Sequence, residues 1–170
     1  MIISCTKKVS EKLKKYRSFS NTSEEIGFHN WYCNLITIER KQNILFTNSL
    51  TLFSFYFPFG TSKIKSNIEA AFENKLKEEI IRHISCSESY LNAVIPRDSE
   101  YKFIHSTNKS VLGSMNEFKR QIDYCIWDRP YYYRSDERII ESINTCPMRG
   151  INLESPIRKM KDELQNRVNK

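Results

Sequence analysis

Residues 31–38 read WYCNLITI, and this stretch decides the fold because aromatic and β-branched residues dominate it. After the polar tetrapeptide at 39–42, residues 43–47 (NILFT) return to the same texture. A third run at 51–57 (TLFSFYF) is almost wholly apolar and ends at Pro58. The three runs predict consecutive strands joined by short links, with 51–57 as a buried central strand.

Helical periodicity follows this meander. Apolar residues at four-residue steps predict a helix over 66–84, with Ser66 as its N-cap, and another over 110–127. A basic amphipathic helix is expected over 155–170, because Ser155 and Pro156 form a typical helix start.

The remaining elements are shorter. Residues 1–5 predict a buried strand, 7–17 a basic helix, 18–27 a loop and 101–105 an edge strand. Together these elements predict a single α+β domain over residues 1–170. We expect a mostly antiparallel sheet of four or five strands, packed by two main helices and followed by a helical C-terminal tail.

The chain is basic. It has 170 residues, with 27 Lys and Arg against 20 Asp and Glu, and a formal charge of +7. Such an excess favours contact with a polyanion, most simply nucleic acid, although charge also serves solubility. The helix over 7–17 carries six basic residues against Glu11 alone, a pattern that a solvated outer face also explains.

The cysteines and the hydropathy of the sequence indicate in which cellular compartment the protein is expected. Five cysteines at wide spacing, without a C-x-x-C pair, are typical of reduced thiols in a cytoplasmic protein. No signal peptide is visible, and the most apolar stretch, 50–59, is too short to span a bilayer. We therefore expect a protein that does not enter the membrane.

Motifs for known chemistry are missing from the sequence. It contains no dinucleotide fingerprint, phosphate-binding loop, zinc protease motif or hydrolase elbow. The three histidines, at 29, 83 and 105, are far apart and have no ligand at metal-binding spacing. We expect neither a metal site nor a cofactor.

One segment suggests an anion site. Polar and small residues gather where the strand at 101–105 gives way to the helix over 110–127, and a helix start presents free backbone N–H groups. The residues expected to bind a phosphate or another anion there are Lys109, Ser110, Ser114 and Asn116. The alternative is structural: Asn108 or Ser110 caps the helix, and Gly113 permits close packing.

A second segment is the predicted hairpin. Arg40 and Lys41, beside Trp31 and Tyr32, could hold the phosphates of a single strand whose bases stack on the rings. The alternative is that the rings lie in the core and the charges protect an edge.

Two further hypotheses stay open. The run Tyr131, Tyr132 and Tyr133 lies between two arginines and suits a protein contact surface, or the packing of the tail onto the body. A small metal-independent enzyme, such as a ribonuclease-like toxin of a mobile element, would need a general acid and base. His29 and His105 are among the candidates for these roles, but their spacing does not set them apart.

Several strings recur in one pattern: ISCTKK at 3–8, WYCNL at 31–35, RK at 40–41, LFTN at 45–48, TLFS at 51–54, SVLGSMN at 110–116 and NTCPM at 144–148. The pattern resembles an uncharacterised family of small bacterial proteins, a domain of unknown function sometimes joined to a plasmid-derived open-reading-frame domain. The resemblance implies a bacterial or mobile-element setting and no activity. The leading hypothesis is a polyanion-binding or regulatory protein in which the hairpin cations and the polar helix start flank one pocket.

Overall fold

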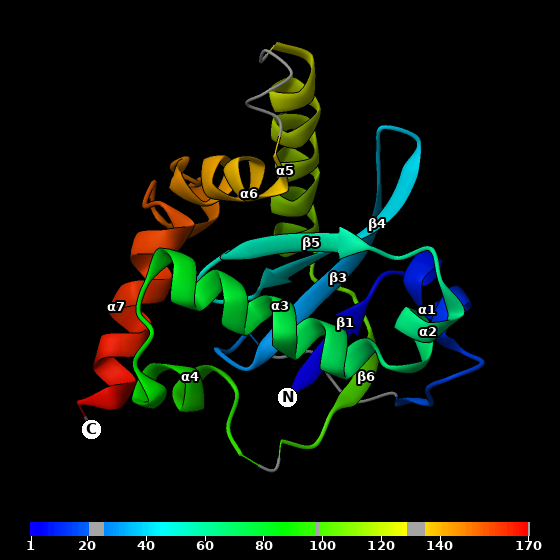
Figure 1. Ribbon diagram of the computed structural model, residues 1–170, viewed down its shortest axis with the longest axis horizontal. Helices are drawn as coiled ribbons and strands as arrows, with labels where there is room; N and C mark the ends of the chain where they lie inside the picture. Colours follow the sequence, from blue (N-terminus) through cyan, green and yellow to red (C-terminus); the bar gives the residue numbers. More distant parts are fainter. Residues whose placement is uncertain (21–25, 98, 129–134, 170) are drawn as a thin grey trace.

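The computed structural model describes residues 1–20, 26–97, 99–128 and 135–169. It shows an α+β fold in which α3 crosses one face of a sheet and α5 stands at the other (Figure 1). The elements in chain order are β1 Ile2–Cys5, α1 Lys7–Leu13, β2 Phe19–Ser20, β3 Asn30–Ile38, β4 Lys41–Asn48, β5 Ser54–Pro58, α2 Ser62–Ser66, α3 Ile68–His83, α4 Glu88–Val94, β6 Lys102–His105, α5 Lys109–Asp128, α6 Asp136–Thr145, the 3₁₀ turn η2 Arg149–Ile151 and α7 Pro156–Val168.

The sheet is mixed. Its six strands within the described residues have the order β2-β6-β1-β3-β4-β5. The pairs β1–β3, β1–β6 and β2–β6 are parallel, whereas β3–β4 and β4–β5 are antiparallel. The predicted meander is confirmed, but the prediction of a mostly antiparallel sheet of four or five strands is wrong. Hairpins leave local signals in a sequence, while parallel pairs depend on helical crossovers whose return position no local pattern specifies.

Three strand assignments need correction. The run expected to be a central strand forms β5, which is an edge strand, and it is apolar because α3 and α6 both pack on it. The strand expected at an edge forms β6, which has neighbours on both sides. The two-residue strand β2 falls in a segment expected to be a loop.

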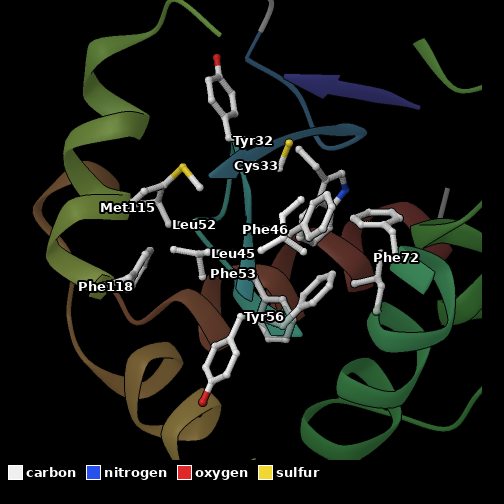
Figure 2. Close-up of a cluster of buried hydrophobic side chains, with 14 of the residues drawn as sticks. Tyr32, Cys33, Leu45, Phe46, Leu52, Phe53, Tyr56, Phe72, Met115 and Phe118 are labelled. Carbon is white, nitrogen blue, oxygen red and sulfur yellow. The ribbon is translucent and has the colours of Figure 1, made fainter. Parts of the chain in front are cut away.

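The core begins with aromatic side chains between the meander and α3 (Figure 2). The ring of Phe72 on α3 lies 4.9 Å from the ring of Phe46, 5.3 Å from that of Trp31 and 5.7 Å from that of Phe55, measured between centroids. Successive strand residues face opposite sides of a sheet, so these three strand residues define the face that α3 covers. Apolar contact among large rings therefore fixes α3 on the meander.

The helix boundaries mostly follow the sequence. The helices expected over 66–84 and 110–127 are present as α3 and α5, and the C-terminal helix begins at Pro156 as expected. Ser66 is not the N-cap of α3: it ends the short helix α2, and its hydroxyl donates to the Lys63 carbonyl at 3.0 Å. Asn67 occupies the N-cap position instead, without a capping hydrogen bond from its side chain.

On its outer side, β5 has no neighbouring strand, and a side chain pairs with its backbone there instead. Asn144 on α6 is fully buried, and its Oδ1 accepts a hydrogen bond from the Ser54 backbone N–H at 2.8 Å. Its Nδ2 donates to the backbone carbonyls of Ser54 at 2.6 Å and Ile140 at 2.8 Å. One amide thus pairs with both backbone groups of Ser54, as a neighbouring strand would.

We expect Asn144→Ala to lower the free energy of unfolding by about 2–4 kcal/mol, because it leaves the buried N–H and C=O of Ser54 without partners. Urea denaturation followed by circular dichroism measures this loss. Asn116→Ala, at an exposed asparagine, is the control and should stay within about 0.5 kcal/mol of wild type. Equal stability of the two variants would contradict the role of Asn144.

Candidate functional site

The polar start of α5 lies beside a groove. Ser110 and Ser114 line it together with the segment 147–150, and the groove has a volume of about 560 Å³. Lys109 and Asn116 are exposed on the adjoining face of α5. The groove therefore contains two of the four residues expected to bind an anion at this helix start.

The capping alternative holds at the same place. The Oδ1 of Asn108 accepts hydrogen bonds from the backbone N–H groups of Ser110 at 2.9 Å and Val111 at 3.3 Å. These are two of the donors that a bound phosphate would use. Gly113, in contrast, is exposed and has open space where a Cβ would stand, so close packing does not explain it.

The opposite wall of the groove, formed by residues 147–150, was not predicted from the sequence. A Cβ on Gly150 would stand 3.1 Å from the Leu52 side chain and 3.3 Å from the Ser114 hydroxyl, so glycine permits this close approach. The approach brings together the strings at 110–116 and 144–148 and adds the exposed cation Arg149. No regular spacing links Arg149 to Ser110 in the sequence.

The predicted hairpin forms as expected, but its aromatic neighbours are buried. Arg40 and Lys41 are exposed at the β3–β4 turn, while Trp31 and Tyr32 are 1% and 0% exposed. The prediction that bases stack on Trp31 and Tyr32 is therefore wrong. Their rings belong to the core, as the structural alternative stated.

The hairpin cations and the α5 start do not share one pocket. At the hairpin, Glu39 lines a separate cleft with Asp123, Ile126 and Trp127, near the other end of α5. Asp123 lies thirteen positions after Ser110 on this helix, a rise of about 20 Å. The prediction of a single pocket is wrong. A binding role for the hairpin cations, and another for the start of α5, each stay a prediction.

A larger group of lysines lies elsewhere, on α1, on the two residues that follow it and on α2. Six of its lysines are exposed and Lys65 is half-buried, and none has an ion-pair partner within 4 Å among the described residues. We call this surface the lysine corner, and it consists of Lys7, Lys8, Lys12, Lys14, Lys15, Lys63 and Lys65.

Arg17 holds the two parts of the lysine corner together. Its guanidinium forms an ion pair with Glu69 on α3, and its Nη2 donates to the Ser66 carbonyl at 2.8 Å. The hydrogen bond to Glu69 is the main cause of a raised Arg17 pKa. Because Arg17 follows α1 and Ser66 ends α2, this contact anchors the two lysine-bearing segments to each other.

The whole formal net charge of the chain lies in the two segments that carry the lysine corner. The segments 7–17 and 61–67 contain eight of the 27 basic residues and one of the 20 acidic residues. The rest of the chain carries 19 of each, so its formal charge is zero. The excess of basic residues was visible in the sequence of α1, but the contribution of α2 required the fold.

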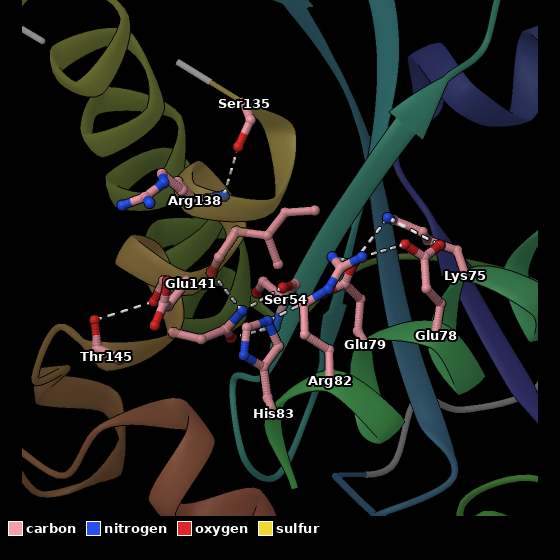
Figure 3. Close-up of polar contacts among 12 residues, drawn as sticks. Ser54, Lys75, Glu78, Glu79, Arg82, His83, Ser135, Arg138, Glu141 and Thr145 are labelled. Carbon is pink, nitrogen blue, oxygen red and sulfur yellow. Dashed lines mark hydrogen bonds and ion pairs between the residues drawn. The ribbon is translucent and has the colours of Figure 1, made fainter. Parts of the chain in front are cut away.

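The histidines lie in three different environments. His105 stacks on Phe19, with ring centroids 5.1 Å apart. His29 lines a groove of about 660 Å³ with Arg167, where burial, the Arg167 charge and the terminal amine lower its pKa. The third, His83, lies 3.1 Å from the buried Glu79 carboxylate (Figure 3). A general acid and base pair of histidines is therefore not assembled within the described residues.

Glu79 is the centre of a charge network on α3. Lys75 Nζ and Arg82 Nη1 lie 2.7 Å and 3.2 Å from its carboxylate (Figure 3). Burial alone would raise the pKa of Glu79, but hydrogen bonds from His83 and Lys75 and the charges of Lys75 and Arg82 hold it below 4.5. The network stabilises α3 and is not part of a groove or cleft described above.

Other site classes are not represented. No described helix is both long enough and apolar enough to cross a bilayer. In the same part of the chain, no three His, Cys, Asp or Glu side chains are grouped to hold a metal ion. The segment Tyr131–Tyr133, expected to contact a protein, lies outside the described residues.

Comparison with known proteins identifies a family to which no function is assigned. A family model described as "Domain of unknown function (DUF6933)" matches residues 2–159. This match confirms the expected resemblance to an uncharacterised family. No curated protein matches the chain.

The turn between β3 and β4 yields a prediction of stability. Glu39 and Arg40 have φ angles of 46° and 65°, in the left-handed region that Asn and Gly occupy at lower energy. We expect Glu39→Asn with Arg40→Gly to raise the free energy of unfolding by about 1–2 kcal/mol, as measured by urea denaturation. Glu39→Ala with Arg40→Ala keeps a Cβ at both positions and should bring no gain; a gain there would contradict strain as the cause.

The Glu79 network yields a pH dependence. Because the folded pKa lies below 4.5, the ionised carboxylate stabilises the native state above that pH, and this contribution disappears as the pH falls through the folded pKa. We expect Glu79→Gln to lower stability at pH 7 and to flatten its decline on acidification, measured by urea denaturation between pH 7 and pH 3. The matched variant Glu117→Gln breaks an exposed pair with Arg120 and should change neither quantity measurably.

Proposed function

Since the chain belongs to the DUF6933 family, a domain of unknown function, we propose from its own surface that it binds a polyanion, nucleic acid in the first place, through the lysine corner. The observation that carries the proposal is the concentration of charge: two segments contain the whole formal excess of +7. Clustered lysines on one face are the electrostatic footprint of contact with phosphates.

The position of the lysines in α1 supports a role other than solubility. Lys7 and Lys8 stand in the first turn of α1, and that turn contains no acidic residue. Positive charge there opposes the helix dipole, so each lysine costs about 0.3–1 kcal/mol relative to an acidic residue. Lys8 and Lys12 also repel one another across one turn. Solubility alone would be served by lysines placed where they do not destabilise the helix.

The hairpin and the start of α5 are proposed as secondary contacts. Arg40 and Lys41 are exposed and form no ion pair with any residue that the structure describes, and Lys109 adds a further cation beside Ser110, Ser114 and Asn116. These cations are two small groups near opposite ends of α5, since the hairpin lies beside Asp123, which is about 20 Å along the helix from Ser110. Their contribution to binding should therefore be smaller than that of the lysine corner.

The test measures affinity for a labelled single-stranded oligonucleotide as a function of salt, by fluorescence anisotropy. We expect Lys7→Gln, Lys8→Gln and Lys12→Gln together to weaken binding at low salt about tenfold and to reduce the slope against log salt by about two units. The same variant should be at least as stable as wild type in urea, because it removes charges that oppose the helix dipole.

A matched variant separates position from total charge. Lys102→Gln, Lys119→Gln and Lys161→Gln remove three exposed lysines outside the lysine corner and should leave affinity close to wild type. A third variant, Arg40→Gln with Lys41→Gln, measures the hairpin. Equal losses in the first two variants, or no binding by the wild type at low salt, would refute the lysine corner as a binding surface.

A further inference from the structure

The cleft between the β3–β4 turn and the end of α5 has a chemistry opposite to that of the lysine corner. Its volume is about 410 Å³, and the described residues that line it are Glu39, Asp123, Ile126 and Trp127. Figure 1 shows the hairpin and the last turns of α5 extending from the same side of the molecule. We call this place the hairpin cleft.

Among the described residues that line the hairpin cleft, the two charged ones are negative. Glu39 is exposed and Asp123 is half-buried, and neither has an ion-pair partner within 4 Å among the described residues. The nearby basic residue Arg120 is engaged with Glu117 at 2.5 Å. Arg40 and Lys41 follow Glu39 in the same turn, but neither forms an ion pair with Glu39 or Asp123. Within the part of the chain that the structure describes, the two carboxylates are therefore not neutralised by direct ion pairing, in a protein whose net charge is positive.

The cleft also exposes an aromatic ring. Trp127 is 86% exposed and Tyr124, one turn earlier on α5, is 66% exposed, whereas the other tryptophan, Trp31, is 1% exposed. An exposed indole face attracts a cation by its quadrupole, more strongly than the ring of Tyr or Phe. Carboxylates and an indole in one cleft favour the same kind of ligand.

We propose that the hairpin cleft binds a basic side chain, arginine or lysine, of a partner protein. The guanidinium or ammonium lies over Trp127, Glu39 and Asp123 neutralise it, and Ile126 contacts its methylene groups. A nucleic acid is disfavoured at this cleft because its phosphates would face both carboxylates. The assignment is independent of the lysine corner and adds a protein partner to a polyanion-binding surface.

The backbone of the turn supports a role for Glu39. Two consecutive non-glycine residues in the left-handed region, Glu39 and Arg40, cost free energy that an Asn-Gly turn would avoid. Such strain is found where the position of a side chain matters for function. Here the turn places a carboxylate at the wall of the cleft.

The test titrates the full chain with a capped hexaarginine peptide and follows the two indole N–H signals by NMR. We expect the Trp127 signal to shift and the Trp31 signal to stay. Glu39→Gln with Asp123→Asn should weaken binding about fivefold, and Trp127→Ala about two- to fivefold, while Trp127→Phe retains part of the affinity. The control Glu141→Gln with Asp162→Asn removes two exposed carboxylates elsewhere and should bind the peptide like wild type.

Three results would overturn the assignment. The first is equal affinity of the cleft variant and the control variant. The second is a Trp127 shift caused by an oligonucleotide and not by the peptide, which would make the cleft a base-stacking site. The third is concentration-dependent self-association that Trp127→Ala abolishes, which would make a second copy the occupant.

Discussion

The arrangement of the molecule depends on the parallel pairing of β1 with a strand on each side. Ile3 aligns with Trp31 of β3 and with Phe103 of β6, so β1 lies inside the sheet and its backbone groups are paired in both directions. Parallel neighbours cannot be joined by a tight turn, and the chain must cross the sheet between them. The helix α1 leaves β1 in the connection that leads to β3, and α2 begins the connection that leads from β5, at one edge of the sheet, to β6 on the other side of β1. The lysine corner consists of residues on these two connections.

The sequence predicted the parts of this fold that depend on neighbours in the chain. The meander, α3, α5 and the start of α7 at Pro156 all follow from periodicity, turn residues and caps within a few positions. What it could not specify is where distant elements meet. The strand order around β1 and the edge position of β5 result from crossovers and from packing by helices on both faces, and no local pattern encodes either.

The candidate site, too, could not be predicted where it depends on how distant elements meet. Arg40, Lys41 and Ser110 were recognisable as polar residues at element ends, but their separation along α5 depends on where that helix crosses the sheet. Burial of Trp31 and exposure of Trp127 could not be distinguished by residue type, because the same side chain serves in cores and at interfaces. The excess of lysines around α1 is visible in the sequence as a count, but the contact of Arg17 with Ser66, which joins that segment to α2, depends on tertiary structure.

The closed edges of the sheet restrict how this protein can associate. A strand with free backbone groups is a template for another chain, and long flat edges lead to fibrils or to domain exchange. Here β2 offers only two residues, and β5 has Asn144 on the backbone of Ser54 and a proline as its last residue. Extension of the sheet from one molecule to the next is thus hindered at both ends. A contact with another chain would then use side chains on helices and turns, where recognition depends on charge and shape.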